Sequence, residues 1–501
     1  MASGVEAVES ERGRGGSPYR SAATAVALTW VLRFIGLFSV FVLARLLSPR
    51  DFGIIALAAA TMALVDIFSA LGIRQALLRI PDPERAHLDT AWTIQLILLV
   101  LLAATLAASA PAAAVFFREP ALAPVTAMLS LRLVFQGLAN IGIVEFDRSL
   151  QMGKDLRMRV SVRLAALAGT IAAAVLLRSY WALVIGLVLQ SALHAGASYL
   201  FHPYRPRLSL AKRSELLNVS LWMFLAYAAQ VVHQQAERLA VGRIAAAHLV
   251  GLYSVGKDLA SIFTLEIATA LNRVTFVTTA RRGQPLDSDP VRAIALLGCY
   301  AMIAAPAGIG LAAVAEDAVT FLFGRRWSEA AGLLQLIAPA SGFYAVYKLI
   351  VSSLQASDRA RAAAIMSCCG AGATAALIFA IATGGGDAYS IATAALALSG
   401  GTLLAGILVF ARVARVPPLR LGAAVCRPFA AAAAMFLLVR LAALETGMIA
   451  VDLGLSIALG GVAYVAALVT IWAASGRPDG AEKTAFALLH SRVRSQRCGA
   501  V

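Results

Sequence analysis

Charged residues are scarce in this sequence. Of its 501 residues only 14% are Asp, Glu, Lys or Arg, whereas 60% are hydrophobic, and the mean hydropathy is +0.80. Soluble domains average about 25% charged and about 45–50% apolar residues. A soluble core cannot hold this much apolar surface, so the composition excludes a soluble globular protein and indicates helices that cross a lipid bilayer.

Sequence motifs of common enzyme chemistry are also missing. There is no G-x-x-x-x-G-K-[ST] phosphate loop, which argues against ATP hydrolysis by this chain. The five cysteines show no C-x-x-C spacing and the six histidines are scattered, so we expect no disulfide framework, metal site or cofactor. Residues 1–20 lack an apolar centre and a cleavage site, and we expect a disordered cytoplasmic tail there instead of a signal peptide.

What the sequence does contain is a series of apolar stretches bounded by Pro, Gly and charge. Their lengths predict an all-α integral membrane protein with about 14 transmembrane helices and short connections, which leave no room for a soluble catalytic domain. The predicted helices cover residues 21–47, 52–78, 88–117, 121–146, 158–178, 180–201, 215–243, 248–277, 291–315, 329–356, 360–383, 387–412, 421–441 and 449–474.

The distribution of basic residues predicts the orientation. With the N-terminus inside, the cytoplasmic segments hold 26 Lys and Arg and the outside segments hold 6. Cytoplasmic loops carry such an excess, so both termini are expected in the cytoplasm. The net charge of +16 is therefore explained by topology, because the basic residues are dispersed and form no nucleic-acid-binding patch.

An internal repeat appears when the chain is shifted by 198 residues. Arg45 and Gly53 follow the first predicted helix, and Arg243 and Gly251 follow the seventh with the same spacing. Six helices separate the copies, which predicts two like-oriented six-helix lobes related by an axis along the membrane normal. The expected division is an N-lobe at 21–203, a C-lobe at 214–412, two accessory helices at 421–474 and a cytoplasmic tail at 475–501.

Polar side chains recur along one face of several predicted helices, at spacings of three and four residues. Arg33 and Lys348 are the strongest functional candidates, because each is a cation within an apolar helix and has no opposite charge within one turn. The other polar-face residues that we consider for substrate binding are Gln136, Asn140, Gln230, Gln234, Tyr344 and Gln355. Candidate ion-coupling residues are Asp66, Asp258 and Glu266.

These faces recur in equivalent helices of the two halves, which predicts one cavity lined by both lobes. An alternative interpretation is that the polar side chains only hold helices together. In that case Glu237 would pair with its neighbour Arg238, and Lys257 with its neighbour Asp258.

Two segments resemble a known family. Residues 43–53 (LARLLSPRDFG) are similar to the N-terminal signature of bacterial polysaccharide and O-antigen flippases. Trp222-Met-Phe, residues 237–243 (ERLAVGR) and residues 250–254 (VGLYS) resemble the middle signature of the same family. This family belongs to the multidrug/oligosaccharidyl-lipid/polysaccharide exporter superfamily.

The resemblance implies a function and the chemistry of its site. Such flippases move an undecaprenyl-pyrophosphate-linked oligosaccharide to the periplasmic leaflet by alternating access, and they work with a polysaccharide polymerase and export machinery. Their cavities are cationic, and Arg33, Arg132, Arg273 and Lys348 are the positions that supply this charge here. Guanidinium groups suit a pyrophosphate because they bind phosphate in a bidentate fashion.

Two other functions remain open from the sequence. A cation or drug antiporter of the same superfamily would use acidic residues such as Asp66, Glu237, Asp258 and Glu266, although cavity cations argue against a cationic cargo. A membrane polysaccharide polymerase normally has a large outside loop or a soluble domain with catalytic carboxylates, and the longest outside loop here is short. We therefore expect a transporter and no enzyme.

Overall fold

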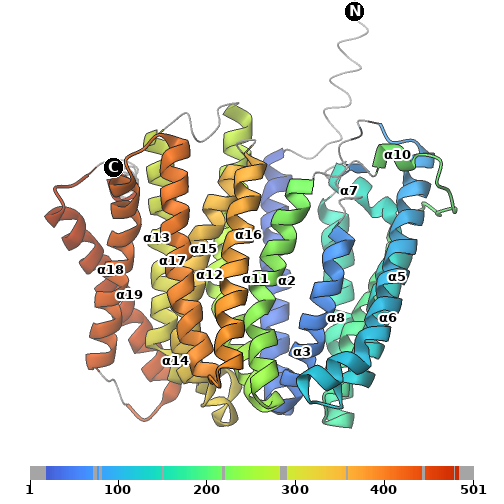
Figure 1. Cartoon of the computed structure of the whole chain (residues 1–501), viewed down its shortest axis with the longest axis horizontal. Coiled ribbons are helices and arrows are strands. Elements are labelled where there is room, and N and C mark those ends of the chain that lie inside the picture. The colour runs from blue at the N-terminus through green and yellow to red at the C-terminus, as the bar shows by residue number, and fades with distance from the viewer. Residues whose placement is uncertain are drawn as a thin grey trace, which may run out of the picture. The chain divides into compact units, whose positions relative to one another are not determined.

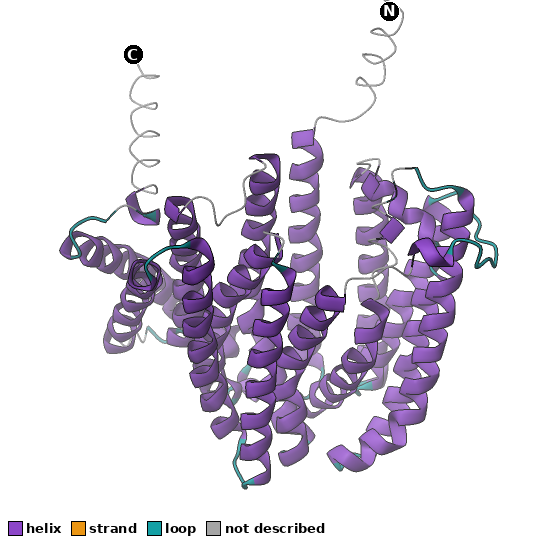
Figure 2. Cartoon of the chain, turned by 45° about the horizontal axis from the view of Figure 1, so that its top comes forward, coloured by secondary structure: helices purple, strands orange, loops and turns teal. Residues whose placement is uncertain are grey.

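The computed structural model describes residues 18–70, 76–77, 80, 82–148, 152–216, 221–282, 290–356, 359–442, 446–478 and 480–483. Side chains at 18–29 and 266–282 lie outside this description. Helices make up nearly all of the described chain, which contains no β-strand (Figure 2). The prediction of an all-α protein is confirmed.

The chain divides into two compact units, Met1–Tyr227 and Ala228–Val501, with the boundary inside α11. The first unit contains α2 (Pro18–Leu46), α3 (Pro49–Asp66), η1 (Ile67–Ala70), α5 (Arg85–Phe117), α6 (Leu122–Leu138), η2 (Ile141–Ile143), α7 (Val144–Arg148), α8 (Met152–Leu177), α9 (Trp181–Phe201), α10 (Arg213–Leu216) and the start of α11 (Leu221–Ile244) (Figure 1). The second contains the rest of α11, α12 (Ala247–Arg282), α13 (Pro290–Ala313), α14 (Ala315–Phe323), η4 (Arg325–Trp327), α15 (Ala330–Ala356), α16 (Ala360–Thr383), α17 (Ala388–Ala414), α18 (Pro418–Ala442) and α19 (Ile449–Ala474).

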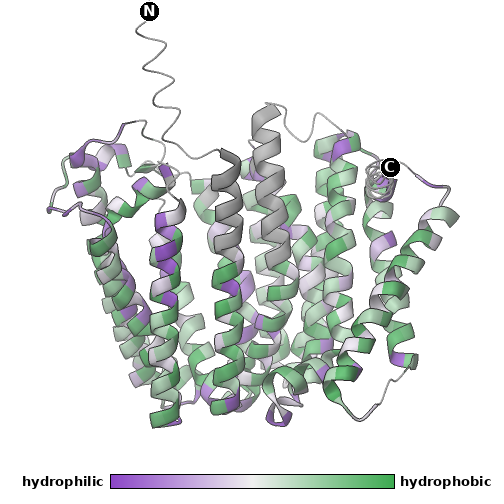
Figure 3. Ribbon diagram, turned by 180° about the vertical axis from the view of Figure 1, so that it is seen from behind, coloured by the Kyte–Doolittle hydropathy of each residue, from purple (hydrophilic) through white to green (hydrophobic). Residues whose placement is uncertain are grey.

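Among the described residues, ten helices are long and apolar enough to cross a membrane. They are α3 with its 3₁₀ extension, α5, α8, α9, α13 and α15 to α19. Figure 3 shows that hydrophobic residues cover most of their length. Large apolar side chains such as Leu176, Leu200 and Leu441 are at least four-fifths exposed, as expected of surfaces solvated by lipid. The chain is thus a multi-pass membrane protein, and the count of 14 spans stays a prediction.

A helix lies within each of the fourteen predicted stretches, but one predicted helix is interrupted. The segment 121–146 was expected to be continuous, whereas α6 ends at Leu138 and the chain is extended at Ala139. The Asn140 amide explains the break, because it accepts a hydrogen bond from the Gly142 N–H and donates to the carbonyl of Tyr204 at 2.7 Å. A side chain that bonds the backbone in this way competes with the helix.

The 198-residue repeat coincides with the helix boundaries. In the first copy α2 ends at Leu46 and α3 begins at Pro49, and in the second α11 ends at Ile244 and α12 begins at Ala247. The helix end and the helix start in the second copy each lie 198 residues after their counterparts in the first copy. The repeat therefore marks the same helix-turn-helix element in each half, while the arrangement of two lobes about an axis remains a prediction.

The N-terminal signature builds this turn. Ser48 and Asp51 form a capping box at the start of α3, in which the Ser48 N–H donates to Asp51 at 2.9 Å. The other oxygen of the Asp51 carboxylate accepts from the Tyr180 N–H at 2.9 Å, just before α9. Arg50 also forms a 3.2 Å ion pair with Glu119. These signature residues thus fix the ends of several helices.

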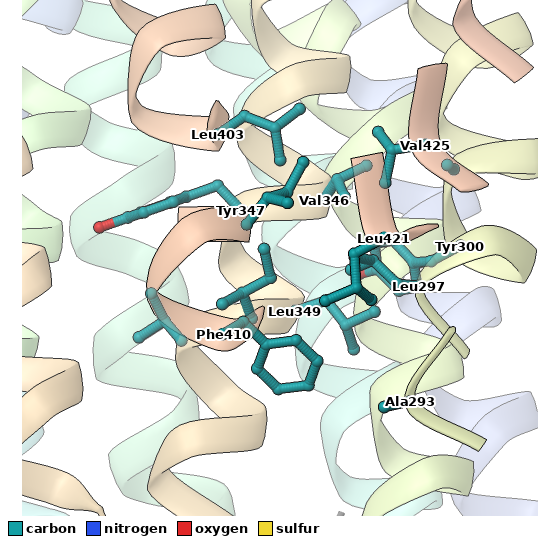
Figure 4. Packing of buried hydrophobic residues seen from close by; sticks show 14 of the residues in the cluster. Ala293, Leu297, Tyr300, Val346, Tyr347, Leu349, Leu403, Phe410, Leu421 and Val425 are labelled. Carbon is teal, nitrogen blue, oxygen red and sulfur yellow. The ribbon is translucent and has the colours of Figure 1, made fainter. Parts of the chain in front are cut away.

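The core of the second unit lies where α13, α15, α17 and α18 meet. Figure 4 shows buried side chains from these helices in contact, among them Leu297, Val346, Leu403 and Leu421. The backbones of α13 and α15 approach closely, since a Cβ on Gly308 would lie 2.7 Å from the Ala338 carbonyl oxygen. Only glycine fits at such a crossing, as in many membrane helix pairs.

The last two helices pack on the same unit. Met435 of α18 and Tyr464 of α19 join a buried cluster with Ala305 of α13, and the Tyr464 hydroxyl donates to the Met302 carbonyl at 2.9 Å. The predicted accessory helices are therefore firmly attached to α13.

Candidate functional site

In the first unit, two arginines of different apolar helices lie within electrostatic range of each other. Arg132 is ten residues into α6, and it is within electrostatic range of Asp66 at the end of α3 and of Arg163 on α8. Arg163 donates a 2.6 Å hydrogen bond to the Gln190 side chain of α9. A Cβ on Gly36 of α2 would lie 3.1 Å from its Nη2, so this glycine leaves room for the guanidinium.

The arginine pair outnumbers the acidic groups near it. Both side chains are only partly exposed, and Asp66 is the carboxylate within electrostatic range of Arg132 in the described residues. Two like charges held near one carboxylate leave a net positive charge, which an anionic ligand would neutralise. Of the predicted residues, the structure brings Arg132 and Asp66 together.

Arg163 was missed by the sequence analysis. The predicted helix began at residue 158, which placed Arg163 near an interface beside Arg157 and Arg159. In the structure α8 begins at Met152, so Arg163 lies 11 residues, or about 17 Å, inside the helix. The first turns are helical despite their charge, and Asp155 and Arg159 pair at 2.7 Å across one turn. The i,i+4 spacing of these two opposite charges was the sequence signal that could have indicated a helix beginning before residue 158.

The second unit also contains a cation within an apolar helix, Lys348. It lies on α15, eight residues or about 12 Å from the helix end, and is partly exposed. Among the described residues, no carboxylate forms an ion pair with it. Tyr344 precedes it, and Ser352 and Gln355 follow it, at helical spacings on the same face.

A small polar cavity lies next to this face. Its volume is about 50 Å³, which holds a few water molecules and is too small for a sugar ring. The lining residues include His233, Gln234 and Glu237 of α11, Lys257 of α12 and Tyr344 of α15. The predicted residues Gln234 and Tyr344 therefore meet at a site of water or ion size in this structure.

Aromatic side chains border the cavity. The rings of His233 and Tyr344 are stacked with their centroids 4.4 Å apart, and Tyr344 is in turn 5.9 Å from Tyr347. His233 Nδ1 is 3.1 Å from the Thr374 hydroxyl of α16. These contacts connect α11, α15 and α16.

Two ion pairs join α11 and α12. Glu237 pairs with Lys257 at 2.8 Å, and Arg238 forms a short ion pair with Asp258. The alternative interpretation in the sequence analysis paired sequence neighbours, and this pairing is wrong. Adjacent residues on a helix point in directions about 100° apart, so each side chain meets the facing helix instead.

The remaining predicted residues have varied positions. Asn140 is fully buried and bonded to backbone groups, so it does not extend the polar face of α6. Gln136, Gln230 and Arg33 are partly exposed on their helices. Glu266 and Arg273 lie on α12, but their side chains are outside the described part of the chain.

Hydrogen bonds to α5 hold the segment 202–209, which follows α9. Asp89 of α5 accepts from the Tyr204 hydroxyl and, at 2.9 Å, from the Arg207 N–H. Burial, followed by the bond to Asp89, raises the pKa of Tyr204, so this hydroxyl stays protonated as a donor. The segment is thus fixed to the first turns of α5.

Comparisons with known proteins agree with these features. The family described as "Polysaccharide biosynthesis protein" matches residues 42–332. The lipopolysaccharide biosynthesis protein WzxC of Escherichia coli (strain K12) is 23% identical over 357 residues, which cover 70% of this chain and 71% of WzxC. The succinoglycan biosynthesis transport protein ExoT of Rhizobium meliloti (strain 1021) is 26% identical over 320 residues, 63% of each chain.

The fold is shared with solved membrane transporters. The lipid II flippase MurJ in an inward closed conformation has a TM-score of 0.70 at 12% identity, covering 90% of this chain and 99% of that one. An inward-facing multidrug resistance MATE family transporter of the MOP superfamily has a TM-score of 0.53 at 13% identity, covering 79% and 99%. At these identities the likeness concerns the fold alone.

Proposed function

The chain belongs to the polysaccharide biosynthesis protein family, and from this premise we propose that it is a flippase for a lipid-linked oligosaccharide. Its cargo is an undecaprenyl-pyrophosphate-linked glycan, carried from the cytoplasmic to the periplasmic leaflet by alternating access. The protein lies in the bacterial inner membrane with both termini in the cytoplasm, and it delivers its cargo to a polysaccharide polymerase and export machinery.

The observation that carries this proposal is the cationic chemistry inside an apolar helical protein. Arg132 and Arg163 lie deep in the first unit, and Lys348 lies inside α15 of the second. Buried cations are costly in a bilayer, so they indicate a polar pathway and an anionic ligand. A pyrophosphate has several negative charges and accepts the forked hydrogen bonds that arginine donates.

The names of the relatives and the fold support the same function. WzxC and ExoT are named for lipopolysaccharide biosynthesis and succinoglycan transport, and MurJ for flipping lipid II. An antiporter for cationic drugs is less consistent with the charges. Two of the four carboxylates that could bind a cationic cargo, Glu237 and Asp258, are already paired with Lys257 and Arg238.

Deletion of the gene provides the test. We expect the deletion strain to lose its surface polysaccharide and to accumulate the lipid-linked oligosaccharide in the cytoplasmic leaflet, where it is labelled in inverted membrane vesicles. A strain lacking a polymerase would instead accumulate single repeat units in the periplasmic leaflet. Altered drug resistance with normal surface polysaccharide would support the antiporter and overturn the proposal.

A further inference from the structure

The small cavity in the second unit contains a ready set of cation ligands. One oxygen of the Glu237 carboxylate and the Gln234 backbone carbonyl lie together at the contact of α11 and α12, and the Tyr253 hydroxyl donates to that carboxylate oxygen. Carboxylate and carbonyl oxygens are the ligands that hard metal cations take in proteins. A free monovalent cation would therefore find suitable ligands here if the site were vacant.

Lys257 already occupies this position. Its Nζ lies 2.8 Å from Glu237 Oε2 and 2.9 Å from the Gln234 carbonyl oxygen. Tyr253, which is fully buried, donates a 2.6 Å hydrogen bond to the same carboxylate oxygen. The ammonium group has three N–H donors, so two bonds to the protein leave a third for a cavity water.

The charges of the cavity are balanced without a bound ion. Glu237 is neutralised by Lys257, and the neighbouring Asp258 is neutralised by Arg238. His233, which also lines the cavity, bonds Thr374 and stacks on Tyr344. The space of about 50 Å³ is large enough for an ion, but among the described side chains of the lining an added cation would meet no uncompensated carboxylate.

We propose that Lys257 is a tethered cation that fills a cation-binding site formed by Glu237, Tyr253 and the Gln234 carbonyl. The wild-type protein consequently binds no free sodium ion at this cavity. Removal of the ammonium group uncovers the site, which then accepts sodium or a small alkylammonium ion. This inference concerns the cavity of the second unit and does not depend on the identity of the cargo.

The test measures thermal unfolding of the purified full chain with sodium, methylammonium or the bulky N-methylglucamine as the only cation. We expect no difference among the three for the wild type. For Lys257→Ala, sodium or methylammonium should raise Tm by about 2–4 °C relative to N-methylglucamine. The matched double variant Glu237→Gln with Lys257→Ala lacks the carboxylate and should show no such rise.

Two results would overturn the proposal. One is a wild-type protein whose Tm rises with sodium and whose Glu237→Gln variant loses that rise, because the site would then bind a free ion beside Lys257. The other is a folded Lys257→Ala variant whose Tm rises with neither sodium nor methylammonium. The same conclusion would follow if the double variant showed a rise in Tm equal to that of Lys257→Ala. The comparison of the wild type with Glu237→Gln shows whether a free ion binds beside Lys257, even where Lys257→Ala yields no folded protein.

Discussion

Replacing Lys348 by glutamine is expected to lower oligosaccharide translocation by about 10- to 100-fold without lowering the amount of protein in the membrane. The estimate follows from the loss of one charge-assisted hydrogen bond, which contributes about 1.5–3 kcal/mol. Among the described residues, Lys348 forms no ion pair that the substitution would break. We therefore expect the substitution to weaken cargo binding and to leave the stability of the protein unchanged. Surface polysaccharide and membrane protein levels are the two quantities to measure.

Matched variants separate charge from structure. Lys348→Arg keeps the positive charge and should retain most of the activity, whereas Lys154→Gln removes an exposed cation at the start of α8 and should have little effect. Arg33→Gln, which removes the predicted cation of α2, is expected to act in the same direction as Lys348→Gln. Normal polysaccharide export in both Arg33→Gln and Lys348→Gln would exclude these residues from the mechanism.

Gly308→Val is expected to destabilise the second unit by about 3 kcal/mol. A Cβ at this position of α13 would lie 2.7 Å from the Ala338 carbonyl oxygen of α15. The obstacle is backbone, which cannot rotate away as a side chain can, so the two helices must separate. The measurement is the Tm of detergent-purified protein and its yield from membranes.

Other glycines of the same unit provide the controls. Gly342 faces Gly308 across the crossing, and its added Cβ would lie 3.1 Å from the Ala304 carbonyl oxygen, so Gly342→Val should be destabilising too. Gly372 of α16 has no atom within 4 Å of an added Cβ, and Gly372→Val should leave Tm nearly unchanged. A Gly308→Val protein as stable as the Gly372→Val protein would show that close backbone packing does not hold α13 against α15.

Much of the fold was predictable because lipid imposes a simple rule on the chain. Every spanning segment must satisfy its backbone groups internally and present apolar side chains, so helices appear as apolar runs. The helices α16 and α19 have the predicted ends, 360–383 and 449–474. The break at Ala139 was not predictable, because it depends on Asn140 reaching the distant Tyr204 carbonyl.

The candidate site was predictable only in part. Arg132, Asp66 and Lys348 stood out because a charge within an apolar run is conspicuous. The pairing of Glu237 with Lys257 was not visible, since 20 residues separate them and their contact depends on how α11 and α12 face each other. Arg163 was missed because helical structure continues through a charged first turn, which hydropathy alone places outside the membrane.

Translocation in reconstituted vesicles measures whether cations inside the helices bind the pyrophosphate of the cargo. Purified wild-type protein and the double variant Arg132→Gln with Lys348→Gln are reconstituted with a fluorescent polyprenyl-pyrophosphate oligosaccharide, and the fraction reaching the opposite leaflet is followed over time. We expect rapid translocation by the wild type and at least about tenfold slower translocation by the double variant. Equal rates for the two proteins would show that these cations do not bind the cargo during translocation.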